Sequence, residues 1–277
     1  MDEAVDVEAL VAPVHTPQVS SNHTKIQSLV SPSTLRRKSA DIRLVGCHSE
    51  VYEPCDDSFA LVDALLADRV HLEEVQPSLC LELGCGSGYV ITSLALMLGE
   101  GTGIQYLATD INSAAIEVTK KTLEAHGVHA EVILTDLVSG LDKRLAGTVD
   151  VLVVNPPYVP TSEEEVGGDG IAAAWAGGEH GRTVIDRILA IVDNLLSSKG
   201  WFYLVTLTAN KPSEICLIMK QKGFASRIIV QRSTEEESLH VLKFWRDPLE
   251  ITTDIGTSQP HLSSTWRFSR LAFWKNS

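Results

Sequence analysis

The sequence predicts an α/β fold, a doubly wound and mostly parallel sheet of seven strands that ends in an antiparallel hairpin. Short segments with strand character alternate with segments of helical periodicity along most of the chain. The segment 149–154 is almost entirely apolar, which is typical of a parallel strand covered on both faces. Glycine and polar residues follow the predicted strands, at the edge where such sheets bind ligands.

The predicted elements begin near residue 56, where Asp56-Asp57-Ser58 offers N-cap residues for a first helix. Strands are then expected at 79–83, 105–109, 130–135, 149–154 and 201–207. Helices are expected at 89–98, 113–127, 183–196 and 212–223, with Ser113 as the cap of the second of these. Two further strands, 227–231 and 239–245, flank a turn and form the predicted hairpin.

Composition divides the chain into three regions. Residues 1–46 are rich in Ser, Thr, Pro, His and Val without periodicity, and we expect a disordered tail there. Residues 47–247 hold the predicted domain. Residues 248–277 look irregular and combine aromatic with basic side chains. This extension fits a partner-binding segment, a membrane-surface segment or an ordered strap, and the sequence does not choose among them.

The chain is acidic, with a formal net charge of −13 over 277 residues. Both terminal regions are nearly neutral, so the negative charge lies in the domain. Such a surface repels phosphate backbones, which argues against nucleic acid as a partner and favours a neutral or basic protein.

The five cysteines form no C-x-x-C pair, so the sequence indicates neither a disulfide framework nor a metal site. Reduced thiols suit a cytoplasmic protein, and the cluster Arg36-Arg37-Lys38 leaves a nuclear location open beside a plain solvated charge cluster. No apolar run approaches the roughly 20 residues that span a bilayer. The acidic start of the chain does not fit a secretory or organellar leader.

The first predicted strand leads into a glycine turn, residues 84–88. Gly84 and Gly86 would let the backbone turn tightly beside a ligand, and Gly88 would let the next helix pack against the strand. A dinucleotide fingerprint has its third glycine three places after the second, where this chain has Tyr89. The spacing therefore disfavours a pyrophosphate, while Glu82 is placed to hold a cationic amino-acid group.

Carboxylates follow the next two strands. Asp110 comes about twenty residues after the turn, where a carboxylate can accept hydrogen bonds from ribose hydroxyls; the alternative is a helix N-cap. Asp136 and Leu137 could contact an adenine amino group and ring face, or could be ordinary loop residues. Together these features suit a nucleoside without phosphates, and S-adenosylmethionine is the common ligand of that kind.

The fourth strand ends in Asn155-Pro156-Pro157-Tyr158, called the shelf below. The prolines fix the backbone and keep Asn155 extended. A planar NH2 group fits the shelf, because the Asn155 side-chain oxygen and the Pro156 carbonyl can each accept one N–H while Tyr158 stacks on the flat group. The alternative is a simple strand-terminating turn.

The shelf and the run from Glu82 to Gly88 resemble motifs of the class I S-adenosylmethionine-dependent amino-methyltransferases, which have a Rossmann-like fold. Within that group the chain is similar to the eukaryotic and archaeal HemK-type enzymes, which methylate the glutamine of the Gly-Gly-Gln loop in translation termination release factors. The stretches 51–59, 173–178 and 181–182 carry this closer match, which covers roughly residues 50–246.

The resemblance implies roles for individual residues. Asn155 and Pro156 would hold the target nitrogen, and Tyr158 would pack against the substrate amide. The implied contacts to S-adenosylmethionine are Ser58, Glu82, Gly84, Gly86, Asp110, Asp136, Leu137 and Asn155. A small zinc-ribbon activator subunit would cover an apolar edge of the domain and form a heterodimer, and the protein substrate would be the eukaryotic release factor.

Other functions fit parts of the same pattern. The shelf could serve adenine-N6 methylation of nucleic acid, although the acidic domain argues against it, and relatives are reported to methylate histone lysine. A cofactor-binding scaffold subunit without catalysis is the non-enzymatic alternative. A nicotinamide dehydrogenase is opposed by the glycine spacing.

Overall fold

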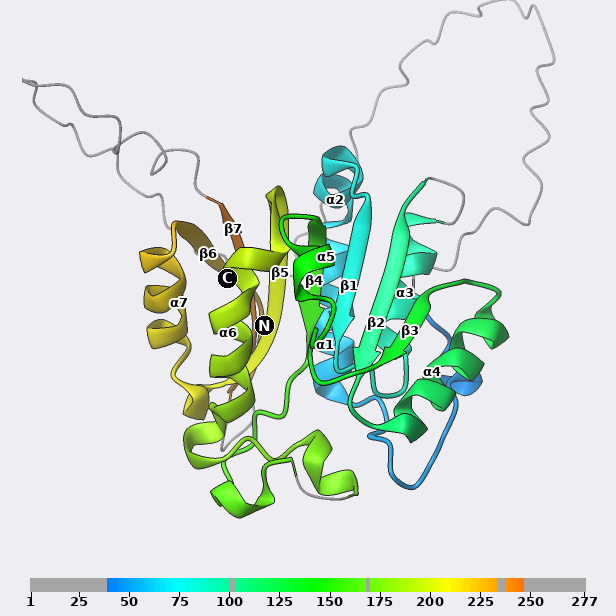
Figure 1. Cartoon of the computed structure of the whole chain (residues 1–277), viewed down its shortest axis with the longest axis horizontal. Coiled ribbons are helices and arrows are strands. Elements are labelled where there is room, and N and C mark those ends of the chain that lie inside the picture. The colour runs from blue at the N-terminus through cyan, green and yellow to red at the C-terminus, as the bar shows by residue number, and fades with distance from the viewer. Residues whose placement is uncertain (1–38, 100–102, 168–169, 234–237, 247–277) are drawn as a thin grey trace, which may run out of the picture. The chain divides into compact units, whose positions relative to one another are not determined.

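The computed structural model describes residues 39–99, 103–167, 170–233 and 238–246, coloured in Figure 1. The described strands form one seven-stranded sheet in the order β3-β2-β1-β4-β5-β7-β6. Their bounds are β1 Leu79–Leu83, β2 Gln105–Asp110, β3 Glu131–Leu134, β4 Val149–Val154, β5 Leu196–Leu207, β6 Phe224–Ser233 and β7 Ser238–Arg246. Strand β7 runs antiparallel to both neighbours, and the remaining pairs are parallel. The predicted fold class is therefore confirmed.

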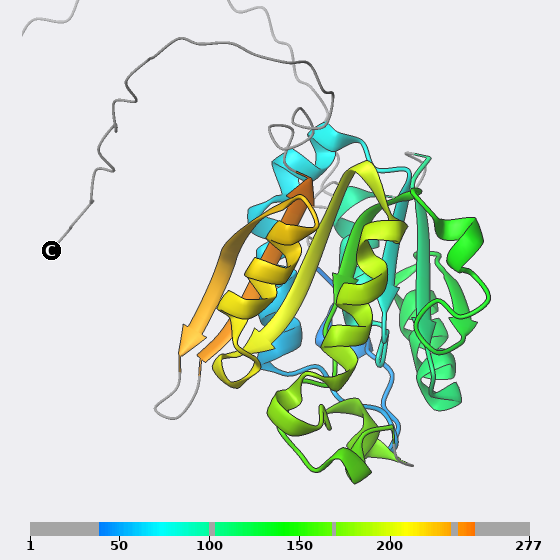
Figure 2. The ribbon, with the colours of Figure 1, turned by 60° about the vertical axis from the view of Figure 1, so that its left-hand side comes forward.

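Helices cover both faces of this sheet (Figure 1). One face packs against α1 Asp56–Ala67, α2 Arg69–Val75, α3 Tyr89–Leu98 and α4 Ser113–His126. The other packs against α5 Asp142–Leu145, α6 Thr183–Leu195 and α7 Pro212–Gln221. All six residues of β4 are buried. Five of them are apolar, as expected of a central strand covered on both faces, and the sixth, Asp150, accepts hydrogen bonds from Ser78 and Ser197. In Figure 2 the strands β6 and β7 (orange) end the sheet beyond β5 (yellow).

Two predicted helix caps were wrong. Helix α1 has Cys55 at its N-cap position and no side-chain cap, because the Asp57 carboxylate turns inward to other partners described below. Helix α4 is capped by Asn112, whose side chain accepts a hydrogen bond from the amide of Ala114, rather than by Ser113. The short helices α2 and α5 were not predicted, since neither has enough turns to show a clear periodicity.

The domain begins earlier than residue 47. The amide of Ala40 donates to the Ser93 hydroxyl at 3.0 Å, and the amide of Gly46 donates to the Thr122 hydroxyl at 3.0 Å. The segment 39–46 therefore packs against α3 and α4, and the tail expected over 1–46 is too long at its C-terminal end. Residues 1–38 and 247–277, which carry the rest of that tail and the extension 248–277, lie outside the described residues.

The carboxyl ends of the parallel strands point downward in Figure 1, toward the segment that follows β4. Leu83 of β1 pairs with Val154 of β4 in register, so the glycine turn and the shelf leave the sheet side by side. The carboxyl edge is where a doubly wound sheet binds its ligand. Among the described helices, none has both the length and the apolar character needed to cross a membrane.

Candidate functional site

The glycine turn is built to lie against a ligand. Gly84 and Gly86 have φ of +73° and +49°, and a Cβ added to either would meet nothing within 4 Å. The backbone therefore favours glycine there for conformational reasons, and the space beside it is open. Gly88 differs, because its Cβ would come within 2.9 Å of the Thr119 Cα. The close packing at Gly88 is thus with α4, and not with the sheet as the sequence suggested.

Two carboxylates lie at the glycine turn. Glu82 is 2% exposed and accepts a 2.9 Å hydrogen bond from the amide of Ile91 in the first turn of α3. Burial raises the pKa of Glu82 well above its ordinary value. The hydrogen bond from Ile91 lowers this pKa in part, and the negative charge of Asp110 raises it further. A cation bound beside Glu82 would stabilise its ionised form, which fits the predicted contact with an ammonium group.

Asp110 links the turn to the start of α4. Its Oδ2 accepts from the amide of Gly86 at 2.9 Å, and its Oδ1 accepts from the amide of Asn112 at 2.8 Å. Burial raises the pKa of Asp110, and these backbone hydrogen bonds offset part of that effect. The cap of α4 itself is Asn112, so the alternative of Asp110 as the helix cap is wrong.

Asp136 and Leu137 follow β3 at the same edge of the sheet. The carboxylate of Asp136 forms a 2.6 Å ion pair with Arg187 of α6, which the sequence did not reveal. Leu137 has φ of +51°, a left-handed conformation that is uncommon for a residue with a side chain. Their contact with an adenine ring stays a prediction.

The shelf carries two hydrogen-bond acceptors that the described residues leave without a donor. Asn155 donates from Nδ2 to the Asp57 carboxylate at 3.1 Å. Its Oδ1 is buried and has no hydrogen-bond partner among the described residues. Within the same residues the Pro156 carbonyl accepts no hydrogen bond either. A buried acceptor without a partner, such as Asn155 Oδ1, is rare. A planar NH2 group could donate one N–H to this oxygen and the other to the Pro156 carbonyl.

Tyr158 is anchored through its hydroxyl, which donates to the Asp57 carboxylate at 2.8 Å. Burial, then the charge and the hydrogen bond of Asp57, raise the pKa of Tyr158 above the usual tyrosine range. Tyr158 therefore stays protonated at neutral pH and cannot act as a base. Its stacking on a substrate amide stays a prediction, as does the cofactor contact of Ser58, whose amide and hydroxyl both donate to Asp57.

The structure thus gathers most of the predicted residues in two groups, and the pair Asp136 and Leu137 belongs to neither. Glu82, Asp110 and the glycines surround the turn, while Ser58, Asn155 and Tyr158 meet around Asp57. Asp57 was missed as a site residue because its position before a helix suggested a cap. The described residues hold no group of three or more His, Cys, Asp or Glu side chains arranged for a metal ion.

Behind the shelf, Asn210 and Gly181 fix the backbone. Asn210 is fully buried and donates from Nδ2 to the carbonyls of Tyr158 and His180 at 2.7 and 2.9 Å. A Cβ on Gly181 would lie 1.9 Å from the Tyr158 carbonyl oxygen, so this backbone approach requires glycine. Gly181 belongs to a stretch already used for the resemblance, whereas no local pattern marks Asn210.

A glycine turn and a shelf on neighbouring strands of this sheet, both open to one ligand edge, define a class I methyltransferase. Comparison with known proteins agrees. The family model "Methyltransferase small domain" matches residues 61–231. Methyltransferase HEMK2 of Homo sapiens is 49% identical over 199 residues, which cover 72% of this chain and 91% of that protein.

Two further relatives have names that specify the protein they methylate. The eRF1 methyltransferase catalytic subunit mtq2 of Schizosaccharomyces pombe is 36% identical over 207 residues, which cover 71% of this chain and 90% of that protein. The solved E. cuniculi Mtq2-Trm112 complex, described as responsible for the methylation of the eRF1 translation termination factor, is 29% identical with a TM-score of 0.52. That match covers 72% of this chain and 99% of the other. The chain belongs to the methyltransferase small domain family and, within it, to the HemK type.

Proposed function

We propose that this chain methylates the side-chain amide nitrogen of the glutamine in the Gly-Gly-Gln loop of the eukaryotic release factor. The observation that carries the proposal is the buried Asn155 Oδ1, an acceptor without a partner among the described residues. The relatives named for eRF1 methylation support the choice of protein substrate.

The residues around the glycine turn fit S-adenosylmethionine. Glu82 would hold its ammonium group and Asp110 its ribose, with Gly84 and Gly86 leaving room for the chain between them. Asp136 and Leu137 would bind the adenine. When bound, the cofactor supplies an electrophilic methyl group on a sulfonium.

The shelf prepares the nucleophile. An amide nitrogen is weakly nucleophilic because its lone pair is delocalised into the carbonyl group. Hydrogen bonds from its two N–H groups to Asn155 Oδ1 and the Pro156 carbonyl would increase the negative charge on nitrogen and fix the plane of the amide. The residues act by positioning and electrostatic preorganisation. Methyl transfer would break the carbon–sulfur bond of the sulfonium as the carbon–nitrogen bond forms. The methylated amide would then release one N–H proton to water, because Tyr158 is protonated and cannot accept it.

Asn155→Ala tests this function directly. A purified release factor is incubated with this chain, S-adenosylmethionine and the activator subunit, and its peptides are analysed by mass spectrometry. We expect a methylated Gly-Gly-Gln glutamine with the unmodified chain and a rate at least about 100-fold lower with Asn155→Ala. Asn194→Ala removes an exposed amide on α6 and serves as the control. Methylation at lysine only, in duplex DNA only, or nowhere would refute the proposal.

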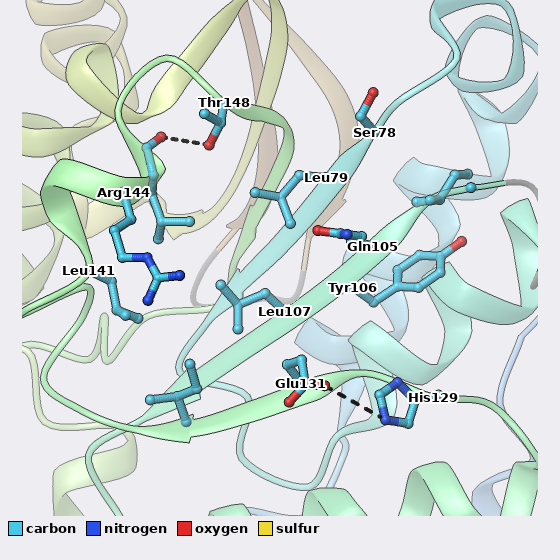
Figure 3. Close-up of a pocket in the computed structure, with 14 residues that line it drawn as sticks. Ser78, Leu79, Gln105, Tyr106, Leu107, His129, Glu131, Leu141, Arg144 and Thr148 are labelled. Carbon is cyan, nitrogen blue, oxygen red and sulfur yellow. Dashed lines mark hydrogen bonds and ion pairs between the residues drawn. The ribbon is translucent and has the colours of Figure 1, made fainter.

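A small activator subunit is part of the proposal. In the described sheet β3 is an edge strand that pairs with β2 alone, so its outer backbone groups can receive another chain. Beside it lies a hollow of about 1040 Å³, which is lined by residues of β1, β2 and β3 and by the segment around α5. Figure 3 shows the residues that line it. Leu79, Leu107 and Leu141 line this hollow and give it an apolar floor. The solved complex of the E. cuniculi relative supports a partner of this kind.

Ile133→Asp places a carboxylate in this hollow and should abolish copurification of the activator. Leu217→Asp is the matched control, because Leu217 is 57% exposed on α7 at the opposite end of the sheet. Unchanged copurification of a folded Ile133→Asp variant would exclude this surface. A cytoplasmic location, which the sequence favoured, suits a translation factor as substrate and stays a prediction.

A further inference from the structure

Asp57 is bonded to the shelf although it precedes Asn155 by 98 residues. It lies in the first turn of α1 and is 5% exposed. We infer that Asp57 is a positioning residue, which fixes the end of the Asn155 amide that faces the substrate and makes the site select an uncharged amide over an amine. The inference rests on the proposed function and names a determinant of its specificity.

The hydrogen bonds of Asp57 leave one orientation for Asn155. Oδ1 of Asp57 accepts from the amide and the hydroxyl of Ser58 at 2.6 and 3.2 Å. Oδ2 accepts from Asn155 Nδ2 at 3.1 Å and from the Tyr158 hydroxyl at 2.8 Å. Four donors therefore converge on the Asp57 carboxylate. An ionised carboxylate can only accept hydrogen bonds, so the NH2 end of Asn155 must face it.

The opposite orientation would remove the chemistry. With the amide reversed, two oxygens would face each other at Asp57, and an NH2 group would meet the NH2 of the substrate. A substrate amide needs acceptors for both of its N–H groups. Asp57 thus binds Asn155 on the side away from the substrate and sets the direction of its amide dipole. Asn155 is the residue that would contact the substrate, and Asp57 acts through it.

Charge gives Asp57 a second effect. A lysine amine attacks a methyl group only when it is deprotonated, whereas a glutamine amide is neutral. The negative charge of Asp57 lies within hydrogen-bonding distance of the Asn155 amide, so it favours the protonated and unreactive form of an amine bound to that amide. It carries no such penalty for an amide, so the site should prefer glutamine.

Asp57→Asn tests both effects, because asparagine has the size of aspartate without its charge. Asparagine also replaces one of the two acceptor oxygens by an NH2 donor, so the orientation of Asn155 is no longer fixed. The chain with its activator subunit is given two peptides that differ only in Gly-Gly-Gln or Gly-Gly-Lys. For Asp57→Asn we expect a kcat on glutamine about 10- to 100-fold lower. The dissociation constant of S-adenosylmethionine, measured by calorimetry, should change less than about twofold, because in our proposal Asp57 contacts no part of that ligand. The ratio of lysine to glutamine methylation should rise.

Asp56→Asn is the matched control, since it removes the same charge one residue earlier, from an exposed side chain. It should behave like the unmodified chain. An unchanged kcat for Asp57→Asn, an unchanged lysine-to-glutamine ratio, or an equal effect of Asp56→Asn would each overturn the inference.

A thermal measurement separates this inference from the proposed function. The melting midpoints of Asp57→Asn, Asn155→Ala and the double variant should be non-additive, because the two side chains share a hydrogen bond. Additive shifts would overturn the positioning role even if no glutamine were methylated. If the unmodified chain leaves release factor untouched while the shifts remain non-additive, the proposed function fails and the positioning of Asn155 stands.

Discussion

Asn210 donates a 2.7 Å hydrogen bond from its side-chain amide to the backbone carbonyl of Tyr158, the last residue of the shelf. Its own Oδ1 accepts from the amide of Leu207 at 2.6 Å. One fully buried side chain therefore joins the end of β5 to the chain that leaves β4. The shelf is thus fixed at both ends, by Asp57 at Asn155 and by Asn210 at Tyr158.

Replacing Asn210 by alanine should destabilise the domain by at least about 2 kcal/mol, because buried backbone groups lose their partners. Urea denaturation measures this loss. Thr208→Ala removes a hydroxyl that bonds Ser238 at an exposed position and should cost less than about 0.5 kcal/mol. Equal losses for the two variants would mean that the Asn210 bonds contribute little.

Gly181→Ala should displace the shelf. Its added Cβ would lie 1.9 Å from the Tyr158 carbonyl oxygen, so the backbone has to move. Gly147→Ala is the control, because Gly147 has a similar φ of +67° and nothing within 4 Å of the added Cβ. The control should lose about 1 kcal/mol from backbone strain, and Gly181→Ala should lose more and also most of its activity. Similar activity and stability of both variants would contradict the close approach.

Stability should depend on pH through Glu82. Because the folded-state pKa of Glu82 is raised above its ordinary value of 4.5, the folded state binds the proton more tightly than the unfolded state. Its contribution to stability is fully present below pH 4.5 and is lost as pH rises through the folded pKa. The unmodified chain should therefore lose stability relative to Glu82→Gln as pH increases from 4.5 toward neutrality.

Denaturant titrations of the two proteins at several pH values measure that difference, and other titrating groups cancel in the comparison. Glu82→Gln should also bind S-adenosylmethionine about 10- to 100-fold more weakly, since it loses a charge-assisted bond to the ammonium group. A stability difference that is constant with pH would show that burial of the Glu82 carboxylate carries no cost.

Asp136→Ala should weaken binding of S-adenosylmethionine by about tenfold if the carboxylate accepts one hydrogen bond from the adenine. Arg187→Ala removes the other member of the ion pair, and both side chains are about half exposed. Its effect on stability should stay below about 1 kcal/mol. Calorimetric titration and thermal melting check the two variants, and unchanged affinity in Asp136→Ala would place the adenine elsewhere.

The sequence by itself determined the features that depend on neighbouring residues. Apolar periodicity specifies a strand or a helix, glycine permits the tight turn at 84–88, and the two prolines keep Asn155 extended whatever surrounds it. These local constraints act at the carboxyl ends of strands, so the ligand edge, the Asn155 acceptor and the carboxylates Glu82 and Asp110 could be predicted.

Only the tertiary structure decided which distant groups complete the site. Asp57 meets Asn155 across 98 residues, and Asn210 meets Tyr158 across 52, because the sheet order places β4 between β1 and β5. The apolar pattern of a strand indicates that the strand is buried, but it does not indicate which strand lies beside it. An aspartate at a helix start looks like a cap until the fold supplies better donors, and an asparagine after a strand looks like a turn. Their roles come from partners that the chain reaches only when it is folded.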